Sequence, residues 1–202
     1  MLLTKVSFTS IPNFLTTADL QKEHNFIMSL FPEITEDNPR SSMDILYRSE
    51  LSSVNPHYLI QSSSLPALEN IKNLRLTDKI KLETKNIDTI YKTLIGHGTV
   101  SYKIRVNPVK TNQGKRTAVR GEENIQDWWV SKSNQLGLEI DLDRIQIIIE
   151  KDRKLQEGVK VASATIVGVA SVADAEKTIE SVKTGIGKEK SYGFGLLLLG
   201  NE

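Results

Sequence analysis

The chain has 202 residues, a formal net charge of +1 and no cysteine, with 39% hydrophobic and 25% charged residues. These proportions exclude a disordered protein, and the lack of cysteine excludes disulfides, zinc–thiolate sites and cysteine nucleophiles. No apolar stretch is long enough to span a bilayer, and the first residues lack the pattern of a signal peptide, so we expect a cytoplasmic protein.

The N-terminal half combines strands with one clear helix. Residues 2–8 alternate as a strand does, and a helix is predicted over about 18–31, begun by Thr16 or Thr17 and followed by Pro32. The other elements predicted in this half are strands over 44–51 and 58–62, which form a hairpin, a short helix over 65–71 and a strand over 79–83.

The C-terminal half follows a break at Gly96-His97-Gly98. Its predicted elements are a strand over 100–110, a helix over 122–135, paired strands over 144–151 and 160–172, a helix capped by Ser171 or Asp174, and a strand over 195–199. This mixture favours an α+β fold. Its length and order fit two tandem ferredoxin-like domains, over 1–92 and 93–202.

Three histidines are present, and His24 shares a helical face with Leu20 and Ile27. The residues alone allow two interpretations of His24: a satisfied core residue, or a proton shuttle near neutral pH. His57 and His97 have the surroundings of turn residues. The sequence lacks the usual metal-binding and phosphate-loop motifs, so we expect neither a metal nor a cofactor.

Residues 101–120 carry six basic side chains and no acidic one. The six are Lys103, Arg105, Lys110, Lys115, Arg116 and Arg120. Such segregation in a nearly neutral chain suggests an anion-binding surface, although a solvated strand and loop would look the same. Lys103 and Arg105 would share one face of a strand, and a loop over 111–120 could follow a phosphate backbone.

Two further segments could bind phosphate. The first is a basic hairpin tip with Lys151, Arg153, Lys154 and Lys160, although charged tips also serve solubility. The second is the glycine-rich stretch 185–195, in which backbone amides, Lys188, Lys190 and Ser191 could approach a phosphate closely.

Several of these segments resemble the CasE (Cse3) family of CRISPR repeat-processing endoribonucleases. The matching segments are GIGKEKSYGFGL at 185–196, YKIRVNPVKT at 102–111, LQKEH at 20–24, LFP at 30–32 and LTKV at 3–6. The resemblance implies two ferredoxin-like (RRM-like) domains and a metal-independent ribonuclease. In this family, the 2′-hydroxyl of a repeat hairpin attacks the adjacent phosphate, and the protein keeps the product as a subunit of the type I-E surveillance complex.

The resemblance also assigns roles to residues of this chain. His24 matches the catalytic histidine, as general acid or base, and Lys160 matches a basic residue near the scissile phosphate. The remaining cations named above, with Ser191, would hold RNA. Family members can carry a tyrosine where this chain has Gln21, and the sequence does not show whether Tyr47 or Tyr102 substitutes.

Two other functions remain open at this point. One is a non-catalytic module that binds RNA hairpins on the same scaffold, because a fold does not secure chemistry. The other, more remote, is a ferredoxin-like domain that senses a small ligand, against which the basic stretch argues.

Overall fold

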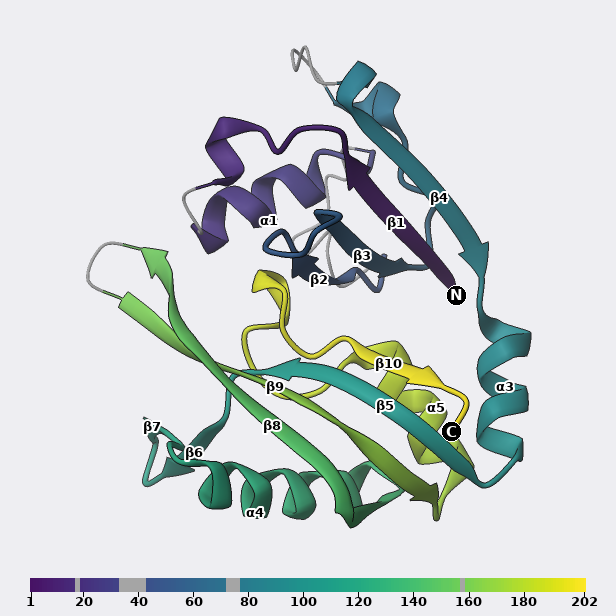
Figure 1. Ribbon diagram of the computed structural model, residues 1–202, viewed down its shortest axis with the longest axis vertical. Coiled ribbons are helices and arrows are strands. Elements are labelled where there is room, and N and C mark those ends of the chain that lie inside the picture. Colours follow the sequence, from purple (N-terminus) through teal and green to yellow (C-terminus); the bar gives the residue numbers. More distant parts are fainter. Residues whose placement is uncertain (17–18, 33–42, 72–76, 157–158) are drawn as a thin grey trace. The chain divides into compact units, whose positions relative to one another are not determined.

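Two four-stranded antiparallel sheets organise the chain (Figure 1). The computed structural model describes residues 1–16, 19–32, 43–71, 77–156 and 159–202. Its contacts divide the chain into unit 1, which comprises Met1–Ile87, Arg153–Lys160 and Ser191–Gly193, and unit 2, which comprises Asp88–Asp152, Val161–Lys190 and Phe194–Glu202. The domain boundary expected between residues 92 and 93 falls inside a helix and stays a prediction.

Unit 1 has the strand order β2-β3-β1-β4. Its elements are β1 (Leu2–Phe8), α1 (Leu20–Met28), β2 (Leu46–Glu50), β3 (His57–Ser62) and β4 (Ile80–Asn86), with 3-10 turns at Asn13–Leu15, Leu68–Asn70 and Thr77–Lys79. All four strands and the β2–β3 hairpin were predicted from the sequence. The expected helix over 65–71 is shorter, a single 3-10 turn.

The core of unit 1 explains these elements. In β1, Thr4, Val6 and Phe8 are buried and alternate with more exposed residues, as in a strand with one covered face. From α1, Phe26 and Ile27 pack into the same apolar cluster. The helix therefore covers one face of the sheet and is held in place by its own apolar stripe.

The start of α1 differs from the prediction. Asp19 is the N-cap, and its side chain accepts hydrogen bonds from the backbone N–H groups of Gln21 and Lys22 at 3.0 and 3.2 Å. Thr16 instead donates its hydroxyl to the Asn13 carbonyl at 2.7 Å. Thr17 lies outside the described residues. A carboxylate satisfies two N–H groups and also favours the positive end of the helix dipole, which explains why Asp19 is the cap.

Unit 2 repeats the same order as β10-β5-β9-β8. Its elements are α3 (Asp88–Gly96), β5 (Thr99–Val106), β6 (Val109–Asn112), β7 (Lys115–Ala118), α4 (Glu122–Ser133), β8 (Leu138–Gln156), β9 (Val159–Val172), α5 (Ala175–Thr184) and β10 (Leu197–Gly200), with 3-10 turns at Asn134–Leu136 and Lys190–Tyr192. Unit 2 shows the β-α-β-β-α-β succession of the ferredoxin-like arrangement that the sequence predicted, in β5, α4, β8, β9, α5 and β10. Unit 1 shares the strand order, and its described residues have a 3-10 turn, Leu68–Asn70, between β3 and β4.

Two elements of unit 2 were missed by the sequence analysis. Helix α3 was not predicted, and the expected loop over 111–120 contains the β6–β7 hairpin. Gln113 and Gly114 have φ of 47° and 77° at its turn. Two consecutive positive φ angles are typical of a type I′ turn, which matches the twist of a hairpin. Lys110, Lys115 and Arg116 therefore lie on a small antiparallel ribbon, and Arg120 follows it.

Of the two caps considered for α5, the structure selects Asp174, whose side chain accepts a hydrogen bond from the Lys177 N–H at 3.0 Å. None of the described helices is long and apolar enough to cross a membrane.

A polar network crosses the sheet of unit 2. Arg105 on β5 contacts Glu150 on β8 at 2.9 Å, and Ser163 and Thr165 on β9 donate their hydroxyls to the same carboxylate. Burial of Glu150 opposes its ionisation, but Arg105 and the two hydroxyls outweigh burial, so its pKa lies below its ordinary value. The ionised carboxylate is thus part of the folded structure.

We expect Glu150→Gln to lower the free energy of unfolding by about 2 kcal/mol at neutral pH, because Arg105 then loses its charged partner in a site that is mostly dry. Because the pKa of Glu150 is lower in the folded than in the unfolded protein, its ionised form stabilises the fold at pH values above the unfolded-state pKa. This stabilisation is lost as the pH falls through the folded-state pKa. Denaturant titrations should therefore show the difference at neutral pH and lose it in acid. Glu83→Gln, which removes an exposed partner of Lys81, is the control; equal midpoints for both variants at neutral pH would contradict this prediction.

Candidate active site around His24

His24 lies on α1 at the border between core and solvent. Its helix neighbours Leu20 and Ile27 are fully buried, whereas the His24 side chain is half-buried. A ring in this position can reach a bound molecule while its surroundings restrict its motion. The other histidines lie elsewhere: His57 begins β3 beside a turn, and His97 is exposed just after α3.

The imidazole of His24 is oriented by the backbone of Ser191. Its Nδ1 lies 2.8 Å from the Ser191 carbonyl oxygen, and both residues belong to unit 1. A carbonyl only accepts hydrogen bonds, so Nδ1 carries the proton and donates it. In the neutral ring the lone pair is then on Nε2. This arrangement fixes the tautomer in which Nε2 can take up a proton.

A tyrosine lies beside His24, and it is neither Tyr47 nor Tyr102. The rings of His24 and Tyr192 have centroids 5.7 Å apart, and the Tyr192 hydroxyl donates to Gln21 Oε1 at 3.3 Å. Tyr47 is 1% exposed in the core of unit 1, and Tyr102 is 2% exposed in unit 2, where burial raises its pKa to about 12. In the sequence, the only signal at Tyr192 is its place in the glycine-rich motif.

Three residues of the glycine-rich segment, Ser191–Gly193, belong to unit 1 and pack tightly there beside α1. Gly193 has a φ of +82°, and a Cβ built on it would lie 2.9 Å from the Tyr47 ring. Only glycine fits both the backbone conformation and this close approach. At least one glycine of the motif is therefore required for packing next to His24.

Arg153, expected to contact RNA, lies against α1. Its guanidinium donates to Glu23, the residue before His24, and the two side chains are 12% and 1% exposed. The backbone of the adjacent Lys154 forms an isolated parallel β-bridge with that of Asp19, the helix cap. An ion pair this deeply buried fixes the end of β8 to the helix that carries His24.

The exposed cations of residues 110–120 contact acidic residues from two other parts of unit 2. Lys110, Lys115 and Arg116 are exposed on the β6–β7 hairpin. Arg116 Nη1 lies 3.6 Å from Glu189 in the glycine-rich segment. Arg120 pairs with Asp152 on β8 at 2.7 Å. These two ion pairs connect the basic stretch with β8 and with the glycine-rich segment, and all four residues belong to unit 2.

The remaining predicted RNA-binding residues have varied surroundings. Arg105 is 10% exposed in its pair with Glu150, and Lys190 donates to the Thr184 carbonyl at the end of α5. The others are half-buried (Lys103) or exposed (Lys151, Lys154 and Lys188). Lys160, the second expected catalytic residue, is exposed near the start of β9 and belongs to unit 1.

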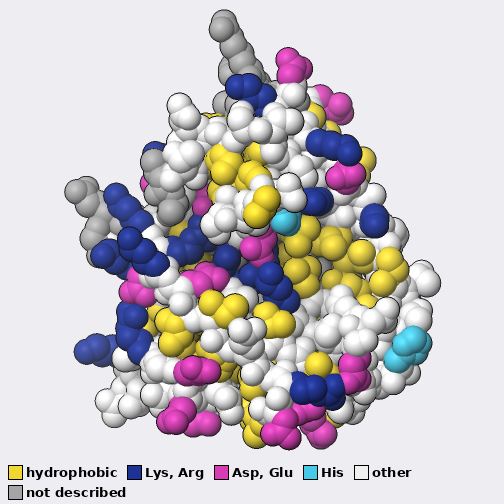
Figure 2. Space-filling model, in the orientation of Figure 1, with side chains coloured by type: hydrophobic (Ala, Val, Ile, Leu, Met, Phe, Trp, Pro, Cys, Tyr) yellow, Lys and Arg dark blue, Asp and Glu magenta, His cyan; other side chains and the backbone are white. Residues whose placement is uncertain are grey.

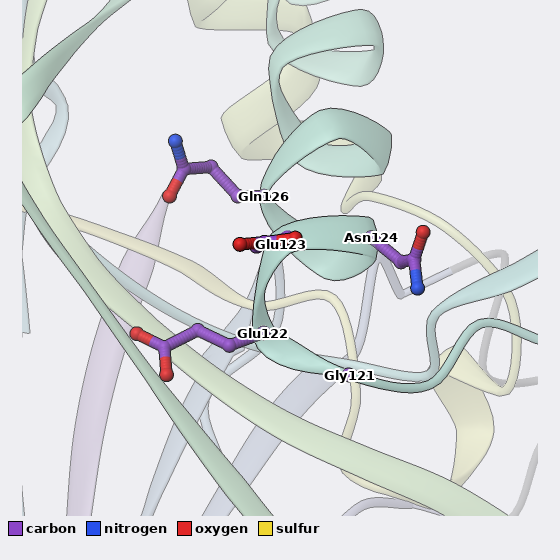
Figure 3. A pocket seen from close by; sticks show the side chains of 5 residues that line it. All are labelled: Gly121, Glu122, Glu123, Asn124 and Gln126. Atoms are coloured by element: carbon purple, nitrogen blue, oxygen red, sulfur yellow. The ribbon is translucent and has the colours of Figure 1, made fainter.

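A shallow hollow of about 440 Å³ lies at the start of α4, lined by Gly121, Glu122, Glu123, Asn124 and Gln126. Figure 3 shows Glu122 and Gln126 on one side of the helix and Asn124 on the other. Its two carboxylates disfavour a phosphate there. Figure 2 shows acidic and basic side chains interspersed on the visible face, in keeping with the near-neutral charge.

Comparisons with known proteins agree with this geometry. A family model described as CRISPR associated protein matches residues 2–200. The CRISPR system Cascade subunit CasE of Escherichia coli K12 is 25% identical over 198 residues, which cover 90% of this chain and 92% of that protein.

Two solved structures have the same fold. The CRISPR endoribonuclease Cse3 bound to a 19-nucleotide RNA matches with a TM-score of 0.78 at 18% identity. The match covers 98% of this chain and 98% of that chain. Thermus thermophilus Cse3, bound to an RNA that represents a pre-cleavage complex, matches with the same score and coverage at 17% identity. They confirm the predicted fold of two ferredoxin-like domains. The chain belongs to the CRISPR associated protein family, and the resemblance to CasE predicted from its sequence is confirmed.

Proposed function

We propose that this protein is a metal-independent endoribonuclease that cleaves CRISPR precursor RNA at repeat hairpins and keeps the product. The observation that carries the proposal is the half-buried imidazole of His24, whose Nδ1 is held by the Ser191 carbonyl. The functions of its relatives support it: CasE is a Cascade subunit, and Cse3 is an endoribonuclease bound to RNA.

The proposed reaction is an internal transfer at one phosphate. The ribose 2′-oxygen forms a bond to phosphorus, and the bond from phosphorus to the 5′-oxygen breaks. A base takes the proton of the 2′-hydroxyl, and an acid gives a proton to the leaving 5′-oxygen. The products are a 2′,3′-cyclic phosphate, or a 3′-phosphate after its hydrolysis, and a 5′-hydroxyl.

His24 Nε2 is the atom that we propose for one of these proton transfers. As a neutral ring, it has its lone pair on Nε2 and can act as the base; as an imidazolium, it can act as the acid. Lys160 is proposed to stabilise the negative charge that develops on the phosphate, an effect commonly worth a few kcal/mol of barrier.

Exposed cations are proposed to hold the hairpin. Lys110, Lys115 and Arg116 project from a ribbon whose strands are polar and exposed except at Val109 and Ala118, which are half-buried. Arg120 pairs with Asp152 at the surface; such pairs contribute little to stability, so a phosphate can replace the carboxylate. Arg105 and Arg153 are mostly buried in ion pairs, and their contact with RNA stays a prediction.

The proposed partners are the repeat RNA and the other subunits of a type I-E surveillance complex. We propose a cytoplasmic location, because precursor RNA and the complex that uses it are expected there. Specificity would come from the shape of the hairpin and from bases near the cut, as is usual for proteins that recognise structured RNA.

We predict that His24→Ala lowers the single-turnover cleavage rate of a labelled repeat hairpin by at least about 10²- to 10⁴-fold, the usual contribution of a general acid or base. Affinity for the hairpin should stay within a few-fold, because the phosphate-binding cations remain. Denaturing gels give the cleavage rate and native gels the affinity.

A hairpin with a single 2′-deoxy ribose just 5′ of the scissile phosphate is the matched substrate control. It should bind normally and stay intact, and a chelator should not change the cleavage of the unmodified RNA. Cleavage of the deoxy substrate would require water as the nucleophile. If wild-type protein shifts the RNA without shortening it, the protein is a binding module instead.

The basic ribbon gives a second prediction. The double variant Lys110→Ala, Lys115→Ala should weaken hairpin binding and lower the slope of log affinity against log salt by about 0.7 to 0.9 for each phosphate that the protein no longer neutralises. Its cleavage rate at saturating protein should stay within about twofold, since it leaves the surroundings of His24 intact. Lys177→Ala, which removes an exposed charge from α5, is the control; a double variant with the same affinity and slope as this control would contradict the prediction.

A further inference from the structure

A hydrogen bond at Nδ1 does not by itself fix the plane of an imidazole. His24 Nδ1 is held by the Ser191 carbonyl, and a tilt of the ring about this hydrogen bond displaces Nε2 more than Nδ1, because Nδ1 is the atom that the carbonyl holds. Displacement of a reacting group by about 1 Å can lower a rate substantially, so a second interaction that stops this motion has catalytic value.

Tyr192 supplies that second interaction. Its ring is tilted by 59° to that of His24, with 5.7 Å between centroids, within the usual range for interacting aromatic rings. Tyr192 follows Ser191 directly, and both belong to the 3-10 turn Lys190–Tyr192. One short turn therefore provides both the hydrogen-bond acceptor and the packing surface for the imidazole.

Gln21 in turn holds the tyrosine. The Tyr192 hydroxyl donates to Gln21 Oε1 at 3.3 Å, and Gln21 Nε2 donates to Asn25 Oδ1 at 2.9 Å. Gln21 and Asn25 are one helical turn apart on α1, so their side chains are neighbours. Because Gln21 has no titratable group, its contribution here is to fix the direction of the tyrosine hydroxyl.

We propose that Tyr192 is a positioning residue for His24, and that Gln21 acts through it. The proposal deepens the proposed ribonuclease function and rests on it for its kinetic consequences. Tyr192 keeps the imidazole plane in place, so that the lone pair on Nε2 points in one direction before RNA binds. The hydroxyl bond to Gln21 prevents the tyrosine ring from turning away.

The first test measures the ring itself and needs no RNA. Nitrogen-15 NMR reports the tautomer of each neutral histidine, and the chain has only three histidines. Wild-type His24 should be the Nδ1–H tautomer. In Tyr192→Phe and Gln21→Leu, a looser ring should bond less tightly to Ser191 and show a mixture of tautomers. His57, whose Nδ1 lies 2.7 Å from the Asn55 carbonyl, should keep its signals and so report that the fold is intact.

The second test is kinetic. Each variant should lower the single-turnover rate by roughly three- to tenfold with unchanged RNA affinity. The double variant should be no worse than either single one, because both remove the same restraint. In a His24→Ala background, Tyr192→Phe should have no further effect. Tyr91→Phe, which removes a hydroxyl that accepts from the Leu199 N–H in unit 2, is the matched control and should change neither tautomer nor rate.

Three results would overturn the proposal. In the first, His24 keeps a single tautomer in both variants. In the second, the two substitutions have fully additive effects on the rate. In the third, Tyr192→Phe abolishes one limb of the pH–rate profile, which would make the tyrosine a proton donor or acceptor. If the wild-type protein does not cleave RNA, the proposed function fails while the tautomer measurement still decides the positioning role.

Discussion

The hydrogen bond from His24 to the carbonyl of Ser191 is the constraint on which the site depends. It joins a residue of the first helix to one 167 positions later in the chain. The bond depends on the start of α1 at Leu20, capped by Asp19, which places His24 at the border of the core. It also requires that the segment 191–193 pack in unit 1, where Gly193 fits against the Tyr47 ring. Both conditions are met by packing and capping before any substrate is present.

The charges of the molecule serve different purposes according to their burial. Arg105 and Arg153 are mostly buried and stabilise the fold through Glu150 and Glu23. The cations of the β6–β7 hairpin are exposed. A chain with a net charge of +1 can therefore present a local positive surface, because acidic residues neutralise the buried arginines.

Helices and strands whose patterns depend on nearby residues in the sequence were predicted well. Alternation located β1, and apolar periodicity located α1 and α5, because a one-sided core imposes these repeats. The β6–β7 hairpin was missed, although Gln113-Gly114 between polar strands is compatible with a type I′ turn. Its strands lack the apolar alternation that makes other strands visible, because neither face of the ribbon covers a core.

The candidate site was only partly predictable, for a different reason. His24 was identified by resemblance, and the sequence gives no sign that Ser191 would bind it through a backbone carbonyl rather than bind phosphate through its hydroxyl. The burial of Arg153 and the approach of Tyr192 to Gln21 are tertiary interactions between distant segments. No local pattern encodes such interactions, so the burial of Arg153 could not be predicted from its place near a hairpin tip, and its contact with RNA stays a prediction.

The central claim is that Nε2 of His24 faces the bond that is cut. The most direct test is a crystal structure of the protein with the 2′-deoxy repeat hairpin bound. The account predicts that Nδ1 remains on the Ser191 carbonyl, and that Nε2 lies within about 3.2 Å of an oxygen of the scissile linkage or reaches it through one water. A ring that presents Nδ1 to the RNA, or that lies beyond the reach of one bridging water, would contradict it.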